Sequence, residues 1–228
     1  MQYIQKQNTK PSNWNTWFTK GTGHRSFDYR ADYSSLPNLK QAKNYLLVEQ
    51  HYLCAYCQQK LTSETASIEH VIPKEFNKEL STNYHNLVAV CKDSPKDNES
   101  KRKHCDKERG NKLLPPFIFY SSSDVTNTSN SPFFKAYSDG QILAKDRISS
   151  EDKAQAEAFI EILNLNHTQL KEKRAKDVLN GLIAAFQLLP HHQRTNYWRV
   201  QFDRILLNKT QPFRQFLLIY IGSKIGIN

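Results

Sequence analysis

Four short segments decide how the rest of this chain is interpreted: CAYC at 54–57, IEHVIP at 68–73, HNLVAVC at 85–91 and HCDKERGN at 104–111. They contain all four cysteines of the 228-residue sequence. They also bring acidic, histidine and amide side chains into the same short stretch, and these side chains can supply an acid, a base or a metal ligand. We therefore interpret the remaining chain outward from residues 54–111.

The four cysteines have the pattern of a metal site. Two residues separate Cys54 from Cys57, and this spacing allows a tight turn that points both sulfurs at one tetrahedral ion. Cys91 and Cys105 have 13 residues between them. This longer gap is tolerable because loop closure costs only about 0.6 kcal/mol more for each doubling of length. We expect a structural zinc ion with four thiolate ligands; disulfide bonds are the alternative, which a reducing compartment disfavours.

The composition indicates a basic protein that is rich in helices. The hydrophobic share is 38%, and only 7 residues are glycine, which favours helices over a β-sandwich or a Rossmann enzyme. The net charge of +10 suggests a polyanionic partner such as nucleic acid, because Lys and Arg on phosphates release counterions. A basic surface that only keeps the protein in solution is the alternative.

No membrane segment is expected. The N-terminus MQYIQKQNTK lacks the apolar stretch of a signal peptide. The longest apolar run, FLLIYIG at 216–222, is far shorter than the roughly 20 residues that span a bilayer. We therefore expect a cytoplasmic protein.

The hydrophobic pattern predicts an α+β fold in two domains. The first domain, 1–147, carries the core motif at 54–114, and the second, 148–228, is helical. In the first domain we expect an irregular arm, a helix, two short strands, a short apolar segment that packs beneath the site, a solvated segment without large apolar residues, a second short helix stopped by two prolines, a surface loop and a hairpin with an Asp-Gly turn. These lie at 1–33, 37–51, 58–62, 67–72, 86–91, 92–104, 106–114, 121–131 and 134–145.

The second domain shows apolar residues at helical spacing, which predicts a bundle core. We expect four helices, at 150–165, at 168–189, at 191–208 and from Pro212 to about 224.

Glu69, His70, Asn86 and Asp106 could together hydrolyse a phosphodiester. This reaction needs a base to activate water, a hard cation to stabilise charge, and a group that holds the base in its tautomer. Adjacent strand residues point to opposite faces, so we expect a strained strand end before Pro73 to bring Glu69 and His70 together. Asp106, at a helix start, offers a hard oxygen ligand suited to Mg²⁺. An ordinary hydrogen-bonded surface is the alternative.

In this order CAYC, IEHVIP, NLVAVC and CDKERGNK resemble an HNH endonuclease of the ββα-metal superfamily. The resemblance implies a hairpin and a helix around one divalent ion, Mg²⁺ or Mn²⁺, braced by the zinc-binding cysteines. It implies DNA hydrolysis with Glu69 as a metal-binding acid, His70 as general base and Asn86 as the residue that orients the base. It also implies Asp106 as the last metal ligand.

The last ligand departs from the family pattern, where it is usually His or Asn. His104 and Asn111 are therefore substitutes for it. Arg109 and Lys112 match the basic residues that follow this ligand and would contact phosphate. The run Lys101, Arg102 and Lys103 would reach across a phosphate backbone, or else form a solvated loop.

A wider resemblance covers EQHYLCAYC, the long gap before HCDKERGN, and the SDGQI hairpin. These features resemble the HNH subunit of Septu-type and retron-associated anti-phage systems, which implies an antiviral complex with a separate ABC/SMC-like ATPase. The chain has no phosphate loop of its own, in agreement with an ATPase supplied by a partner. Two other functions stay open: a non-catalytic zinc-stabilised nucleic-acid-binding module, and an HNH nuclease that cleaves RNA such as transfer RNA.

Overall fold

The computed structural model describes residues 4, 6, 10–17, 39–92, 104–115 and 133–227. Most of the predicted arm at 1–33, the basic run 101–103 and the predicted loop at 121–131 lie outside the described residues. The described elements form an α+β fold with small antiparallel sheets and mostly helical structure after residue 149. In chain order they are α1 (Trp14–Trp17), α2 (Leu39–Glu49), β1 (Ala66–His70), η2 (Lys78–Thr82), η3 (Tyr84–Asn86), β2 (Leu87–Cys91), α3 (Asp106–Arg109), β3 (Phe134–Ala136), β4 (Ile142–Ala144), α5 (Ser150–Ile162), α6 (Thr168–Glu172), η5 (Lys173–Leu179), α7 (Asn180–Leu188), α8 (His191–Leu207) and α9 (Arg214–Lys224).

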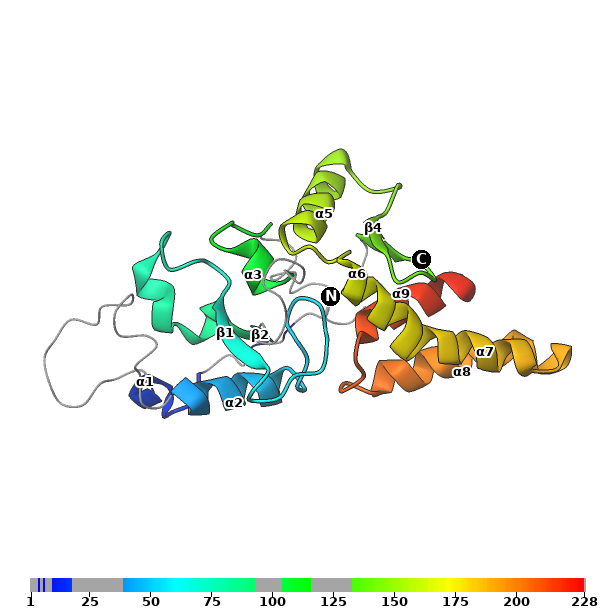
Figure 1. Cartoon of the computed structure of the whole chain (residues 1–228), viewed down its shortest axis with the longest axis horizontal. Helices are drawn as coiled ribbons and strands as arrows, with labels where there is room; N and C mark the ends of the chain where they lie inside the picture. Colours follow the sequence, from blue (N-terminus) through cyan, green and yellow to red (C-terminus); the bar gives the residue numbers. More distant parts are fainter. Residues whose placement is uncertain are drawn as a thin grey trace, which may run out of the picture.

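The β1–β2 hairpin carries the candidate site, with α2 along its side (Figure 1). In the antiparallel register Glu69 faces Val88 and His70 faces Leu87. The strand β2 is LVAVC, and its first four residues are buried, so it belongs to the core beneath the hairpin. The strand predicted at 67–72 and the helix predicted at 37–51 are confirmed, with ends shifted by a few residues. The apolar segment at 86–91 is buried as expected, and most of it forms the strand β2.

The segment that joins α2 to β1 folds as a tight turn around the first cysteine pair. The strand predicted at 58–62 is wrong, because the described chain forms there only an isolated bridge between Leu53 and Lys60. The backbone turns sharply at Gln58, which has a left-handed conformation with φ of 64°. The N–H of Ala55 donates to the carbonyl of Ala89, 3.0 Å away, so the turn is fastened to β2.

The hairpin predicted at 134–145 is confirmed as β3 and β4. Its turn requires glycine at position 140, where φ is 86° and a Cβ would lie 2.0 Å from the carbonyl oxygen of Lys171. The side chain of Asn166 completes the outer edge of β4, since its amide accepts from the N–H of Ile142 at 2.9 Å and donates to the carbonyl of the same residue at 2.7 Å.

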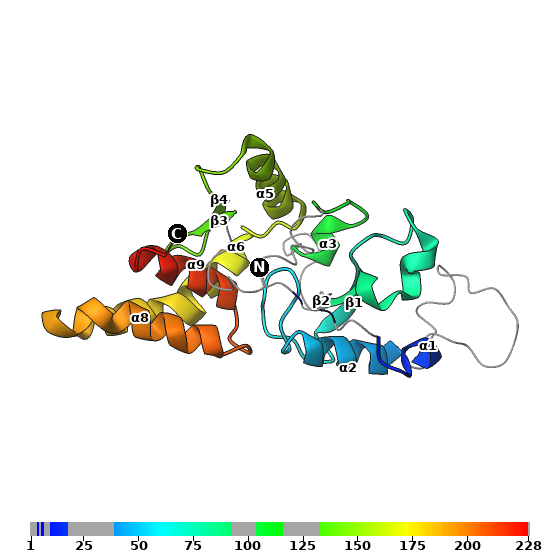
Figure 2. The ribbon, with the colours of Figure 1, turned by 180° about the vertical axis from the view of Figure 1, so that it is seen from behind.

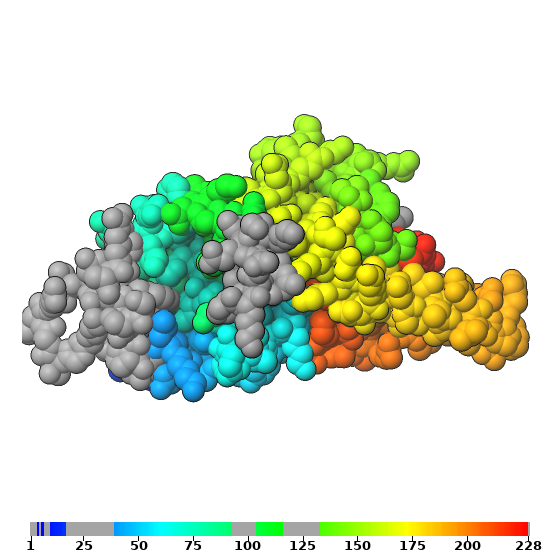
Figure 3. Space-filling model, in the orientation of Figure 1, coloured from blue at the N-terminus to red at the C-terminus, as the bar shows by residue number. Residues whose placement is uncertain are grey.

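The C-terminal helices follow the predicted order. Ser149 caps the N-terminus of α5, since its hydroxyl accepts from the N–H of Asp152. The helix predicted at 168–189 is confirmed in extent, but its middle third, η5, is a π-helix that the sequence pattern did not predict. α7 and α8 project from one end of the molecule (Figures 1 and 3), which explains why α7 has no buried residue, whereas nine successive residues of α9 are buried. Among the described helices none combines the length and apolarity that crossing a membrane requires.

The two predicted domains share one cluster of buried apolar side chains in the described chain, from Trp14 to Ile221. Backbone hydrogen bonds also join them, from the N–H of Cys105 to the carbonyl of Leu163 at 2.9 Å and from Phe213 to Gln58 at 3.0 Å. The view from behind (Figure 2) likewise places α6 and α9 between the hairpin half and the α7–α8 pair. The cysteine-bearing turn therefore lies where the two halves meet.

Candidate metal and catalytic site

The four cysteine sulfurs converge in the folded chain. All four Sγ atoms of Cys54, Cys57, Cys91 and Cys105 lie within 4.8 Å of one another, and all four thiols are free. The Cys54–Cys105 and Cys57–Cys91 sulfur distances are 3.9 and 3.5 Å. Sulfurs 2.3 Å from a tetrahedral zinc ion would be about 3.8 Å apart, whereas a disulfide bond measures about 2.05 Å. The donor set thus fits a tetrahedral metal ion, and the structure does not show the disulfide alternative.

Polar groups already point at these sulfurs. The side-chain amide nitrogen of Gln59 lies 3.5 Å from the sulfur of Cys57 and 3.8 Å from that of Cys91. Nδ1 of His104 lies 3.2 Å from the sulfur of Cys105. N–H donors at sulfur stabilise the thiolate form that a metal requires, as is usual for groups around metal ligands.

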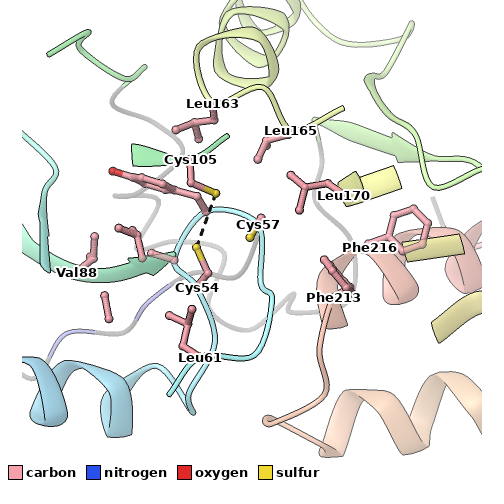
Figure 4. Close-up of a cluster of buried hydrophobic side chains, with 14 of the residues drawn as sticks. Cys54, Cys57, Leu61, Val88, Cys105, Leu163, Leu165, Leu170, Phe213 and Phe216 are labelled. Atoms are coloured by element: carbon pink, nitrogen blue, oxygen red, sulfur yellow. Dashed lines mark hydrogen bonds between the residues drawn. The ribbon is translucent and has the colours of Figure 1, made fainter. Parts of the chain in front are cut away.

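The cysteines come from separate elements that packing brings together. Cys54 and Cys57 lie on the tight turn, Cys91 ends β2, and Cys105 immediately precedes α3. Figure 4 shows Cys54, Cys57 and Cys105 gathered beside Leu163 and the other apolar side chains of the core. The hydrogen bond from Cys105 to Leu163 holds the last ligand in place, despite the 13-residue gap that separates it from Cys91.

Glu69 and Asp106 meet between the end of β1 and the start of α3. Glu69 is buried; its Oε1 contacts the guanidinium of Arg109 and accepts from the hydroxyl of Tyr56 at 3.3 Å. Its pKa is raised to about 8, because burial and the adjacent, hydrogen-bonded Asp106 carboxyl outweigh the attraction of Arg109. Two carboxyl groups held this close offer hard oxygen ligands to one divalent cation.

His70 points toward a different partner. Its Nε2 lies 2.9 Å from the carbonyl oxygen of Ser81, and since that oxygen can only accept, Nε2 carries the proton. Burial lowers the pKa of His70 to about 4, so the ring is neutral at pH 7. The expected strained strand end is wrong: β1 keeps its regular register through His70, so the side chains of Glu69 and His70 reach separate partners.

Among the described residues, the four cysteines are the only group of three or more Cys, His, Asp or Glu side chains that lie close enough together to bind one ion. Glu69 and Asp106 are a pair, and His70 is not a third member.

Asn86 fastens the loop that follows β1. Its Oδ1 accepts from the N–H of Ile72 at 2.7 Å, and its Nδ2 donates to the carbonyls of Ile72 and Leu80 at 3.0 and 3.1 Å. These bonds fix the segment next to Ser81, the partner of His70. Asn86 therefore acts on the histidine through the backbone of this loop and does not touch its ring in any described hydrogen bond.

Arg109 requires a correction. The sequence assigned it to phosphate contact, but it is 1% exposed and its guanidinium lies inside the site. Besides Glu69, the guanidinium binds the hydroxyl of Tyr56 at 2.9 Å and the carbonyls of His70 and Val71 at 2.7 and 2.6 Å. Its Nε donates to the carbonyl of Lys112 at 2.9 Å. Arg109 therefore ties α3 to the end of β1 and is not available to a nucleic-acid backbone.

The remaining candidates lie around this pair. Lys112 and Asn111 are exposed after α3, where Lys112 can reach a phosphate. His104, one of the two substitutes for the last metal ligand, instead contacts Cys105, and its ring centroid is 5.9 Å from that of His167. The structure thus brings Asp106, and not His104, to Glu69. Lys101, Arg102 and Lys103 lie outside the described residues.

Tyr56 and Ser81 also contribute to the site and were not predicted. Tyr56 lies between two cysteines, a position that could have directed attention to it. Ser81 contributes its backbone carbonyl, and a backbone contact leaves no signal in residue type.

Comparison of the chain with models of known protein families and with curated proteins finds no match. Its function is therefore argued from the geometry of the site.

Proposed function

We propose that this chain is a divalent-metal-dependent endonuclease of the HNH type, with a zinc ion as the structural centre of the four cysteines. The observation that carries the proposal is the pairing of Glu69 with Asp106. Glu69 is the penultimate residue of β1 and Asp106 begins a short helix, and their carboxyl groups are adjacent, with Glu69 buried and Asp106 half-buried. Along the chain the first cysteine pair precedes the β1–β2 hairpin, and Cys105 and Asp106 follow it at the start of α3, which is the motif order of the HNH resemblance.

Each residue then has a defined task. Glu69 and Asp106 would hold Mg²⁺ or Mn²⁺, which when bound supplies positive charge for the phosphate and the leaving oxygen. Neutral His70, protonated at Nε2, would accept a proton from the attacking water at Nδ1. Asn86 and the carbonyl of Ser81 hold this tautomer in place.

DNA is the proposed substrate, and the positive charge of the chain supports a nucleic acid in general. With a net charge of +10 the chain attracts polyanions, and exposed Lys112 lies close to α3. The phosphodiester chemistry is the same for RNA, so an RNA substrate such as transfer RNA is a variant of this proposal. Cytoplasmic action with an ABC/SMC-like ATPase in an anti-phage complex is proposed from the sequence resemblance alone.

The test compares purified wild type, His70→Ala and His85→Ala on supercoiled plasmid DNA and on total RNA with Mg²⁺ or Mn²⁺. His85 is a matched control, since it is exposed on the same loop region. We expect the wild type and His85→Ala to cut and His70→Ala to be inactive, with circular dichroism and zinc content unchanged in all three. Cutting by His70→Ala at the wild-type rate would refute the assignment of the base.

A non-catalytic nucleic-acid-binding module is the second candidate. It is favoured by the burial of His70 and by the fact that in the described residues only the cysteines gather as a complete metal-ligand set. It predicts binding with a steep salt dependence and no metal-dependent strand scission.

A further inference from the structure

The π-helix η5 begins with two cations, Lys173 and Arg174, whose side chains are bonded to residues beside the cysteine cluster. Arg174 is 1% exposed. Its guanidinium donates to the carbonyls of Leu165 at 2.7 Å and Gly140 at 3.1 Å, and its Nε is buried with no hydrogen-bond partner. None of the ion pairs found in the described chain gives it a carboxylate. A buried arginine without an anion is costly, so its place needs a reason.

Two neighbours of Arg174, Leu165 and Phe213, lie close in sequence or by hydrogen bond to residues beside the cysteines. Leu165 lies two residues after Leu163, whose carbonyl binds the N–H of Cys105. The guanidinium also lies 5.9 Å from the ring centroid of Phe213, whose N–H donates to Gln58, the residue after Cys57. Figure 4 shows Leu165 and Phe213 on the side of the cysteines that faces the C-terminal helices.

The electrostatic effects agree with this placement. Burial lowers the pKa of Arg174 to about 10, and the negative charges of Cys57 and Cys105 oppose that lowering. The same cause is missing at Arg214, a second buried arginine of the C-terminal helices, whose pKa is lowered by burial alone. Charge at Cys57 and Cys105 therefore favours the protonated form of Arg174.

Lys173 reaches the cluster through a side-chain amide. Its Nζ donates to Oε1 of Gln59 at 2.5 Å, and the amide nitrogen of the same glutamine points at the sulfurs of Cys57 and Cys91. A cation on the oxygen polarises the amide and strengthens its N–H as a donor.

A zinc ion with four thiolates carries a net charge of about −2, since four ligand charges exceed the two of the metal. Placing such a charge in a buried site is unfavourable unless cations balance it. No ion pair of the described chain gives the buried Arg174 a carboxylate, and its positive charge can offset part of the negative charge of four thiolates.

We propose that Arg174, with Lys173 acting through Gln59, forms the positive shell of the metal centre, so that the C-terminal helices complete the site that the four cysteines begin. This inference rests on the proposed zinc occupancy and is independent of the proposed nuclease activity. Arg174 is a positioning residue in this account, because it touches the thiolates only through their charge.

The test measures zinc affinity by chelator competition in the full-length protein. Arg174→Met keeps much of the side-chain volume and removes the charge. Arg214→Met is the matched control, since Arg214 is also buried and also donates to backbone carbonyls, those of Ile205 and Leu206. We expect Arg174→Met to bind zinc about 10- to 100-fold more weakly than wild type, as for other groups around metal ligands. We expect Arg214→Met to stay close to wild type and Arg174→Lys to recover part of the loss.

A packing role gives a different result. If Arg174 only fills space, both arginine variants lower the melting temperature of the zinc-loaded and zinc-free forms alike and leave zinc affinity unchanged, which would overturn the proposal. Lys173→Met, at an exposed position, covers the case in which Arg174→Met does not fold: weaker zinc binding supports the proposal and wild-type affinity refutes it. A wild type that binds no zinc would refute both the zinc centre and its shell, whatever the nuclease assay shows.

Discussion

The hydroxyl of Tyr56 lies 3.3 Å from Oε1 of Glu69. Tyr56 stands between the two cysteines of the tight turn, and its hydroxyl also accepts from Arg109. The turn that carries Cys54 and Cys57 is therefore connected to the candidate catalytic carboxylate by one side chain, through which a disturbance of the cysteine cluster would reach Glu69. This contact gives the cysteine cluster a role in positioning Glu69 as well as in stabilising the fold.

Replacing Tyr56 with phenylalanine removes only this hydroxyl. We expect the free energy of unfolding to fall by about 1.5–3 kcal/mol, the range for a hydrogen bond to a charged group, with zinc content unchanged. Urea unfolding and metal analysis measure the two quantities. Tyr52→Phe, at an exposed tyrosine of the same turn, is the control and should change neither. Equal effects of the two substitutions would contradict the role given to Tyr56.

Replacing Cys54 with serine should remove the metal ion and much of the stability of the junction between the two halves. Three thiolates hold a structural zinc ion poorly, and the free energy of metal binding in such sites is largely folding free energy. We expect less than one zinc per chain and a clear fall in the melting temperature. Zinc added to wild type after chelation should restore its melting temperature but should not restore that of the variant. A melting temperature equal to that of wild type would mean that the cysteines do not hold a stabilising ion.

Arg109→Met and Lys112→Ala should have opposite consequences. Removing buried Arg109 leaves its acceptors on Glu69, Tyr56, His70 and Val71 without their donor, and unsatisfied buried groups cost about 1–3 kcal/mol each. Exposed Lys112 should change stability by less than about 0.5 kcal/mol but weaken binding to DNA and flatten its salt dependence. Chemical unfolding and fluorescence anisotropy at several salt concentrations measure the two effects. A stable Arg109→Met protein with weakened DNA binding would restore the phosphate-contact interpretation of this residue.

The raised pKa of Glu69 predicts a pH dependence of stability in protein that carries zinc but no other divalent cation. Because the folded carboxyl titrates near 8 and its ordinary value is 4.5, the folded state holds a proton that the unfolded state has lost between these values. This contribution therefore lowers stability as pH rises from about 4.5 to 8.

Glu69→Gln imitates the protonated carboxyl and should lack this decline, which urea unfolding at successive pH values can measure. The lowered pKa of His70 has the opposite effect, because its contribution to stability is lost as pH falls from about 6.5 to 4. The two proteins are therefore compared above pH 6.5. A decline of the same size in Glu69→Gln would assign it to another group.

Much of the fold follows from local patterns in the sequence. The Asp139-Gly140 turn and the apolar spacing after residue 149 predicted the β3–β4 hairpin and the order of the C-terminal helices. The spacing of the cysteines predicted their convergence across the long gap after Cys91. Each of these features depends on neighbours along the chain or on one chemical requirement.

The wrong predictions concern contacts between distant segments. Arg109 looked like a surface cation because burial of arginine depends on acceptors, here Glu69 and the carbonyls at the end of β1, that no local pattern reveals. Arg174 gave no signal for the same reason, since its neighbours belong to three other segments. The strand predicted at 58–62 failed because closing the turn around Cys54 and Cys57 took precedence over strand propensity.

We expect one metal ion to support the fold and a different one to be needed for strand scission. Cleavage of supercoiled plasmid by desalted, zinc-loaded wild type before and after addition of Mg²⁺ tests both expectations together. We predict intact plasmid without Mg²⁺ and nicked or linear DNA with it, while the zinc content stays at one ion per chain. Plasmid that stays intact in both conditions, or is cut equally in both, would contradict this prediction.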